Sequence, residues 1–354
     1  MSYNGNGTFN INSTGQPVVA GTTISDSVFN AFTADVGTGL STAICKDGQT
    51  TITANIPLSG YKITGMGLGT ATTDAARVDN ANALDMCEFR LTLTAGTPVT
   101  TADVTAAETV YMSPYRGNRI ALYDGTNWYM RATAEISIDV PDATNCYDVF
   151  CYDNAGTATL ELTAWTNETT RATALTLQNG VLVKTGALTR RYIGTFYCTT
   201  AGNGQTEDSI ANRYLWNYYN RVARPMRVLP NANWAYTSGT IRQANGSTAN
   251  QLNFVIGVGE SPVSANVIAR AYADAGSTLG VGIGLDSTTA YSTASLVSSV
   301  TAVGSASEFF TMQASYSAFP AVGKHYLAWL EAGAAGGNFS NTAQFGGIVG
   351  EILG

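Results

Sequence analysis

The sequence predicts a mainly β protein, and three features of the chain carry this prediction. Short stretches of alternating apolar and polar residues recur from residue 87 to the last residues. Hairpin-type turns such as Asp124-Gly125 and Asn154-Ala155-Gly156 separate them. Charged residues make up only 12% of the chain, and Thr, Ser, Asn, Gly and Ala replace them. Turn signals about ten residues apart are typical of β-sandwiches and barrels.

An extended arm is expected at the start of the sequence. Residues 1–22 are rich in glycine and asparagine and cannot build a core alone, although Phe9 and Ile11 alternate with polar residues as in a short strand. Such an arm either frays or becomes ordered by docking on another body.

A short helical segment follows the arm. Ser25 is placed to cap its N-terminus, and Asp26 in the first turn favours the helix dipole. An apolar seam with a period of about 3.5 residues runs along it, made of Phe29, Phe32, Val36, Leu40 and Ala43. The seam can pack against copies of itself around a three-fold axis, or against its own domain.

Glycines interrupt both the helix and the segment after it. Gly37 and Gly39 each weaken the helix by about 1 kcal/mol, which predicts a break near its middle and two short helices. Asp47-Gly48 ends the helical pattern. Between residues 49 and 80, short β-type pieces at 52–54, 61–63 and 66–69 alternate with glycines.

Two β-sandwich or jelly-roll-like domains are expected after this N-terminal region of residues 1–85, at 86–210 and 211–354. Strands of the first are predicted at 89–93, 119–123, 134–138, 147–152, 160–165 and 192–197. Strands of the second are predicted at 252–256, 263–272, 279–285, 309–314, 325–330 and 348–353.

Arginines and large aromatic residues alternate between the two domains, from Arg213 to Arg227. This pattern suits stacking on nucleic-acid bases, but an acidic chain disfavours it. The favoured interpretation is a linker in which arginine stems cover aromatic faces, with Pro225 leading into the next strand.

The net charge excludes two classes of partner. The chain carries a net charge of −7 and has a sequence pI of about 4.7. A nucleic-acid binder needs a basic face to displace the counterions of phosphates, and an anionic membrane attracts basic segments. No nucleic acid and no docking on an anionic membrane are therefore expected. No stretch approaches 18 apolar residues, so no membrane insertion is expected either, and Met1–Gly7 lacks the features of a signal peptide.

Five cysteines, an odd number at irregular spacings, predict buried free thiols and assembly in a reducing cytoplasm. One histidine, His325, leaves little basis for a histidine metal site or a catalytic triad. The sequence contains no nucleophile elbow, phosphate-binding loop or acidic calcium loop. The chain is therefore predicted not to be an enzyme, with no catalytic residues, no cofactors and no metal.

The first eighty residues carry a more specific resemblance. The segments Leu58-Ser59-Gly60-Tyr61-Lys62-Ile63-Thr64-Gly65-Met66-Gly67 and Thr73-Asp74-Ala75-Ala76-Arg77-Val78 resemble the N-terminal attachment region of tailed-phage fibre proteins. The C-terminal segment, entered through Arg213-Tyr214-Leu215-Trp216-Asn217, is similar to jelly-roll-like domains on many phage fibres, which are often trimeric.

The resemblance implies a podovirus-like virion protein, a homotrimeric tail fibre assembled in the host cytoplasm. Its three chains would intertwine as β pieces over residues 49–80. Its N-terminus would bind phage tail, adaptor, portal or neck proteins, and its C-terminal β domains would bind a host cell-surface glycan or protein non-covalently. Candidate attachment residues are Phe9, Ile11, Pro17, Val18 and Val19. The candidate trimer seam is Phe29, Phe32, Val36 and Leu40. Candidate receptor contacts are Trp234, Tyr236, Tyr291 and Trp329.

Two alternatives stay open. One is a head fibre, decoration or collar protein that binds no receptor. The other is a tailspike that depolymerises polysaccharide, which needs two carboxylates facing one groove. Such enzymes usually sit on long parallel β-helices, and this chain shows no coil repeat.

Overall fold

The computed structural model describes residues 19–41, 55–56, 58, 60–61, 63–66, 86–200, 202–304 and 308–354. The chain forms two compact units, Met1–Gly67 and Leu68–Gly354. Four predicted attachment residues (Phe9, Ile11, Pro17 and Val18) and most of the predicted intertwined region lie outside the described residues.

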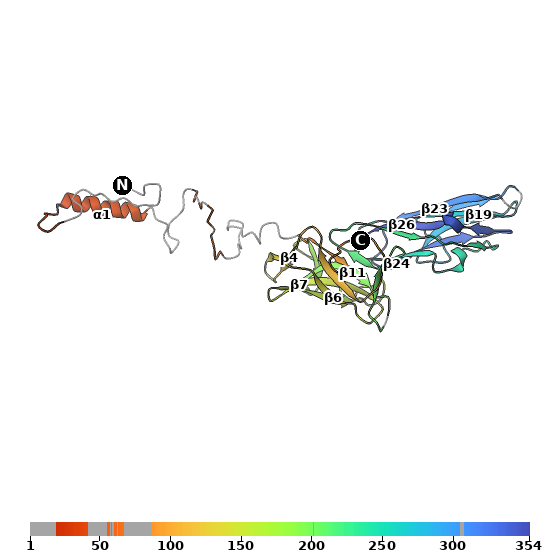
Figure 1. The fold of residues 1–354 in the computed structure, drawn as a ribbon, viewed down its shortest axis with the longest axis horizontal. Helices are drawn as coiled ribbons and strands as arrows, with labels where there is room; N and C mark the ends of the chain where they lie inside the picture. Colours follow the sequence, from red (N-terminus) through yellow and green to blue (C-terminus); the bar gives the residue numbers. More distant parts are fainter. Residues whose placement is uncertain are drawn as a thin grey trace. The chain divides into compact units, whose positions relative to one another are not determined.

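The first unit contains one helix, α1 (Asp26–Ser41), among its described residues (Figure 1). Ser25 caps it as predicted, since the backbone N–H of Val28 donates a 3.3 Å hydrogen bond to Ser25 Oγ. The predicted break at Gly37 and Gly39 is wrong, because α1 runs through both residues. A single glycine costs only about 1 kcal/mol in a helix, and the hydroxyl of Thr38 between them bonds back to the Ala34 carbonyl at 2.9 Å.

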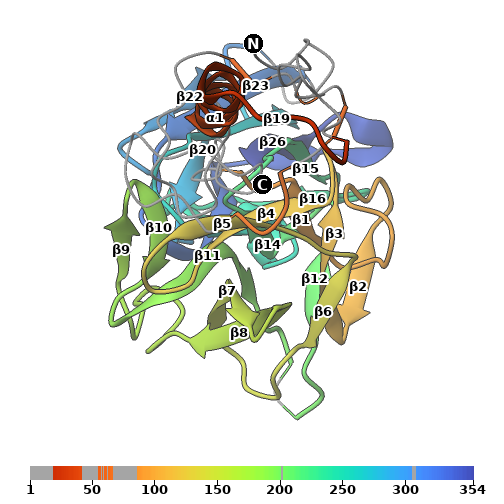
Figure 2. The same ribbon diagram turned by 90° about the vertical axis from the view of Figure 1, so that its left-hand side faces the viewer.

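The second unit is mainly β, which confirms the predicted fold class. Its first strands form a three-stranded, a two-stranded and a six-stranded sheet. The three-stranded sheet has the order β1 (Phe89–Thr92), β3 (Thr109–Pro114), β6 (Ile136–Asp139), and the two-stranded sheet pairs β4 (Arg119–Tyr123) with β5 (Trp128–Ala132). The six-stranded sheet has the order β8 (Thr157–Ala164), β7 (Cys146–Asn154), β11 (Ala187–Tyr197), β10 (Val181–Lys184), β9 (Leu175–Gln178), with β14 (Leu215–Asn217) beside β11 (Figure 2).

Two larger sheets contain most of the later strands. The eight-stranded sheet has the order β2 (Val104–Ala107), β12 (Thr206–Asp208), β13 (Asn212–Arg213), β18 (Gln251–Ile256), β24 (Gly323–Ala332), β20 (Thr278–Leu285), β22 (Ser298–Thr301), with β17 (Arg242–Gln243) beside β24. The seven-stranded sheet has the order β15 (Ala223–Val228), β26 (Gly347–Leu353), β19 (Val263–Tyr272), β23 (Phe310–Ala318), β21 (Ser295–Leu296), with β25 (Asn338–Ser340) and β16 (Asn233–Ala235) beside it. Short 3₁₀ turns lie at η1 (Ala244–Gly246) and η2 (Thr342–Gln344).

These two large sheets pack face to face as a sandwich. Phe254 and Ile283 from one sheet and Val267 and Ile348 from the other belong to a single buried cluster. Strand β19 alternates strictly between buried and exposed residues over most of its length, so one face lies on the core and the other faces outward. In Figure 1, β19, β23 and β26 lie side by side in this layer.

The six-stranded sheet is covered on both faces. Residues Cys146 to Cys151 of β7 are all buried, and alternate members pack into two different clusters. Val149 packs with Phe89 and Met112 of the three-stranded sheet, whereas Phe150 packs into the cluster of the sandwich. A strand covered on both faces loses the apolar–polar alternation that marks a half-exposed one.

The predicted division between residues 210 and 211 is crossed by hydrogen-bonded strands. Strands β2 and β12 come before it in sequence, yet they belong to the same sheet as β18 and β24. The arginine- and aromatic-rich stretch contributes β14 to one sheet and β15 to another. Pro225 lies inside β15, which is an edge strand and therefore tolerates a residue without an N–H.

Candidate functional site

Three of the four predicted receptor-contact residues, Trp234, Tyr236 and Trp329, lie around one buried carboxylate, that of Glu331 on β24. The indole Nε1 of Trp234 donates a 2.7 Å hydrogen bond to Glu331 Oε2. Arg242 donates to Oε1 at 2.9 Å, and its guanidinium lies 3.6 Å from the centre of the Tyr236 ring. Trp329 packs edge-on against Trp234, with ring centres 5.7 Å apart.

This cluster is not an exposed surface, which corrects part of the prediction. Trp329 is fully buried, and Trp234 is only 7% exposed. Tyr291 is half-buried, with its ring against the backbone of Gly282. Neither indole can present a ring face to a sugar, because each is packed in the sandwich core.

The electrostatics of Glu331 are those of a structural group. Burial raises the pKa of this carboxyl, while the hydrogen bonds from Trp234 and Arg242 oppose the rise. Two-carboxylate glycoside hydrolysis needs a second acid across a groove. Over residues 86–200, 202–304 and 308–354, the hydrogen bonds to Glu331 come from the indole of Trp234, the guanidinium of Arg242 and the backbone N–H of Asn245, and none comes from a second carboxyl group.

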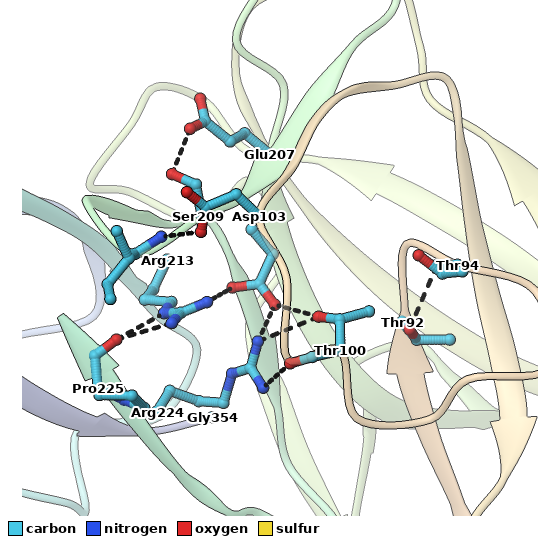
Figure 3. Close-up of polar contacts among 12 residues, drawn as sticks. Thr92, Thr94, Thr100, Asp103, Glu207, Ser209, Arg213, Arg224, Pro225 and Gly354 are labelled. Carbon is cyan, nitrogen blue, oxygen red and sulfur yellow. Dashed lines mark hydrogen bonds and ion pairs between the residues drawn. The ribbon is translucent and has the colours of Figure 1, made fainter.

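A second buried ionic cluster joins distant parts of the second unit. Arg213 donates to one oxygen of Asp208 at 2.9 Å, and Arg224 donates to the other at 2.6 Å. Figure 3 shows these two guanidinium groups converging, with Pro225 beside Arg213 and Thr100 beside Arg224. The side chains of all three charged residues are less than 10% exposed.

Arg90 adds a third buried guanidinium, and it lines a small cavity of about 10 Å³ together with Asp208 and Arg224. It donates to the carbonyls of Pro98 and Gly354 at 3.1 and 2.9 Å, and to the carbonyl of Asn220. Burial and the nearby charge of Arg224 lower the pKa of Arg90 to about 10. Backbone carbonyls therefore occupy the donors of Arg90. Together, these contacts and the ion pairs of Asp208 connect β1, β12, β15 and the residue after β26.

Two exposed phenylalanines and an arginine lie together on the outward face of the seven-stranded sheet. The guanidinium of Arg270 on β19 lies 3.8 Å from the centre of the Phe309 ring and 4.5 Å from that of Phe345. Phe309 is 46% exposed and Phe345 49% exposed. Tyr272 meets Phe309 edge-on, with ring centres 5.2 Å apart. We call Arg270, Phe309 and Phe345 the Phe–Arg–Phe stack.

The strands beside the stack carry exposed hydrogen-bonding side chains. Exposed polar side chains alternate with buried ones on β19 and β23: Ser264, Asn266, Thr311, Gln313 and Ser317. Next to Phe345 is an open cleft of about 280 Å³ lined by Leu229, Pro230, Asn231 and Gln344. Gln344 has a φ of 68°, a left-handed conformation that is unfavourable for residues other than glycine.

Sequence reasoning missed the Phe–Arg–Phe stack for a specific reason. The alternation of residues 263–272 places Arg270 on the polar face of its strand, so the position of the arginine was predictable from the sequence. Phe345 follows η2, in a turn far away in sequence that shows no periodicity. Only the antiparallel pairing of β19 with β26 and β23 brings the three residues together.

The predicted N-terminal site residues that are described all lie in the first unit. Val19 is 64% exposed, Phe29 57% and Leu40 68%. Phe32 and Val36 are half-buried. The helix therefore keeps part of its apolar seam in contact with solvent.

The described residues contain no group of three or more His, Cys, Asp or Glu side chains that could hold a metal ion. Over the same part of the chain, no helix combines the length and the apolarity needed to cross a bilayer. Four cysteines (Cys87, Cys146, Cys151 and Cys198) are free and buried, as predicted, and Cys45 lies outside the described residues.

No family model and no curated protein matches the chain. Its similarity to solved structures is remote. A structure of the infectious bursal disease virus Gx strain is 9% identical with a TM-score of 0.25, covering 73% of each chain. A tryptic core variant of Cry1Da from Bacillus thuringiensis is 10% identical over 70% of this chain with a TM-score of 0.20, and the chain spans only 48% of it. A glycoside hydrolase family 43 arabinoxylan arabinofuranohydrolase from Bacillus subtilis is 12% identical, covering 69% of this chain and 64% of that one, with a TM-score of 0.18. TM-scores this low establish neither a shared fold nor a shared function.

Proposed function

We propose that this chain is a structural virion protein of a tailed phage, a homotrimeric tail fibre. Its N-terminus attaches to a tail, adaptor, portal or neck protein. Its C-terminal β strands contact the host surface without catalysis. The resemblance of residues 58–78 to fibre attachment regions motivates the proposal, and the exposed seam of α1 carries it.

The energetics of α1 support a trimer. A helix of 16 residues is only slightly longer than the about 12–15 residues below which isolated helices barely form. Its two glycines weaken it further, so it is marginal by itself. Packing of an apolar face must therefore stabilise it, yet Phe29 and Leu40 stay more than half exposed. Two further copies of the same helix supply the matching surface, since a seam of this period packs against itself.

Native mass spectrometry of the full-length protein tests the oligomeric state. The expected species is a trimer, and a stable monomer would contradict the proposal. A Phe29→Gln, Leu40→Gln double variant removes the exposed part of the seam and should dissociate the trimer. Ala34→Gln, an exposed change off the seam on the same helix, is the matched control and should remain trimeric.

The place of the protein in the particle needs a separate experiment. Antibodies against the second unit should label an appendage at the tail of intact virions. Labelling of the head or collar would favour the decoration alternative instead. Deleting residues 1–48 should abolish incorporation into particles while the second unit keeps its β circular-dichroism spectrum. Truncated protein that still assembles onto virions would show that the attachment site is wrong.

A further inference from the structure

The Phe–Arg–Phe stack restricts the orientation of a guanidinium. The guanidinium of Arg270 lies over two aromatic rings, at 3.8 and 4.5 Å from their centres, so aromatic surface covers part of its planar group. Its backbone is also held, because its N–H donates a 3.2 Å hydrogen bond to Asn341 Oδ1. The ring contacts therefore restrict the side chain before any ligand arrives.

The edge of this guanidinium is unused. Over residues 86–200, 202–304 and 308–354, no hydrogen bond or ion pair involves the side-chain nitrogens of Arg270. Other partly buried arginines of the unit bind carboxylates, as Arg171 binds Asp148 at 2.7 Å and Arg242 binds Glu331 at 2.8 Å. A guanidinium of restricted orientation with free N–H groups matches the geometry of a carboxylate or phosphate.

The surroundings of Arg270 restrict the kind of molecule that carries this carboxylate or phosphate. The half-exposed rings of Phe309 and Phe345 offer apolar area for the carbon face of a ring. Neutral side chains such as Asn266 and Gln313 nearby can bond hydroxyl groups. The cleft beside Phe345 leaves room for a further unit, and the left-handed Gln344 that lines it stores the kind of backbone strain found at binding sites.

We infer that this face binds an acidic saccharide, with Arg270 receiving its oxyanion and a sugar ring lying against Phe345 or Phe309. The inference rests on the proposed function, because it names the chemistry of the host-surface partner. A nucleic-acid strand also combines rings with phosphates, but the net charge of −7 disfavours it. The oxyanion can be the carboxylate of a uronic acid or the phosphate of a phosphorylated sugar.

Titration calorimetry of the full chain tests the inference with four probes: tetragalacturonic acid, mannose 6-phosphate, maltotetraose and oligothymidylate. We expect heat of binding with the uronic acid, the sugar phosphate or both, and weaker binding of neutral maltotetraose. The first two probes distinguish carboxylate from phosphate as the source of the oxyanion. Equal binding of maltotetraose, a preference for oligothymidylate, or no binding of either acidic probe would overturn it.

Variants then assign the site. Arg270→Gln should weaken binding of the acidic probe by about tenfold or more, since a charge-assisted hydrogen bond contributes about 1.5–3 kcal/mol. Arg270→Lys should not restore it, because an ammonium lacks the planar pair of donors. Phe345→Ala should also weaken binding. Arg227→Gln is the matched control, since Arg227 is an exposed arginine on β15 of the same sheet.

Two readouts keep the outcomes separate. Thermal unfolding of each variant should match the wild type, so that lost binding is not lost folding. Unchanged affinity in Arg270→Gln would overturn the inference even if the wild type binds. A trimer that labels phage tails but binds no acidic probe would leave the fibre proposal standing and remove only the saccharide. A monomer that binds the acidic probe would contradict the trimeric fibre and leave the saccharide site standing.

Discussion

The indole of Trp234 donates its only polar hydrogen to Glu331, and the acceptor side chain is fully buried. Replacing Trp234 with Phe leaves one carboxylate oxygen without this donor while keeping an aromatic ring. We expect a loss of about 1–3 kcal/mol in the free energy of unfolding, measured by urea denaturation. Tyr236→Phe, which removes a hydroxyl bonded to the Thr240 carbonyl at a more exposed position, should change stability far less. Equal effects of the two variants would show that the Trp234 hydrogen bond is not important.

Asp208 is the one carboxylate that Arg213 and Arg224 share. Asp208→Asn removes its charge and leaves two buried guanidinium groups without an anion, so we expect a loss of about 3–5 kcal/mol in the free energy of unfolding. Glu351→Gln, an exposed change on β26, is the control and should have little effect. If Asp208→Asn unfolds at the same denaturant concentration as the control, the cluster does not stabilise the unit.

Gly257, just after β18, lies against two aromatic side chains from earlier strands. A Cβ at this position would overlap the hydroxyl of Tyr192 and the ring of Trp216. Gly257→Ala should therefore lower the free energy of unfolding by about 1–3 kcal/mol, the usual cost of overpacking. Gly239→Ala has open space around its Cβ and is the matched control. Calorimetric melting curves compare the two, and an unchanged melting temperature for Gly257→Ala would contradict the packing described.

Glu161 should make stability depend on pH. Burial alone would raise its pKa, but the hydrogen bonds and charges of Lys184 and Arg190 leave the pKa below its ordinary value of 4.5. A carboxyl with a lowered folded-state pKa stabilises the protein above the unfolded-state pKa, and this contribution disappears as the pH falls through the folded-state value. Glu161→Gln should therefore cost up to about 1 kcal/mol at neutral pH, a small value because the groups are partly exposed.

Urea denaturation of both proteins at neutral and at acidic pH measures this difference. The wild type and Glu161→Gln should converge in acid. A constant difference at every pH would mean that packing, and not charge, explains the effect of the substitution.

The buried thiols should be chemically silent in the native state. Burial raises the pKa of Cys146 and of Cys151 to about 12, so almost no reactive thiolate is present at mildly alkaline pH. In a Cys45→Ser background, an aromatic disulfide reagent should label none of the four remaining cysteines until denaturant is added, and then all four. Rapid labelling of native protein would show that these strands open readily.

The sequence by itself determined the local structure of most of this protein. Alternation predicted β4 and β19 at their observed bounds, and Ser25 marked the start of α1, because these signals depend on neighbouring residues alone. Tertiary structure decided the rest. Pairing between strands distant in sequence buried Trp234 and Trp329 around Glu331, joined β2 and β12 to the sheet of the later strands, and brought Phe345 to Arg270. Periodicity shows which side of a strand is apolar, but only the packing of sheets decides whether that side, or the other, meets solvent.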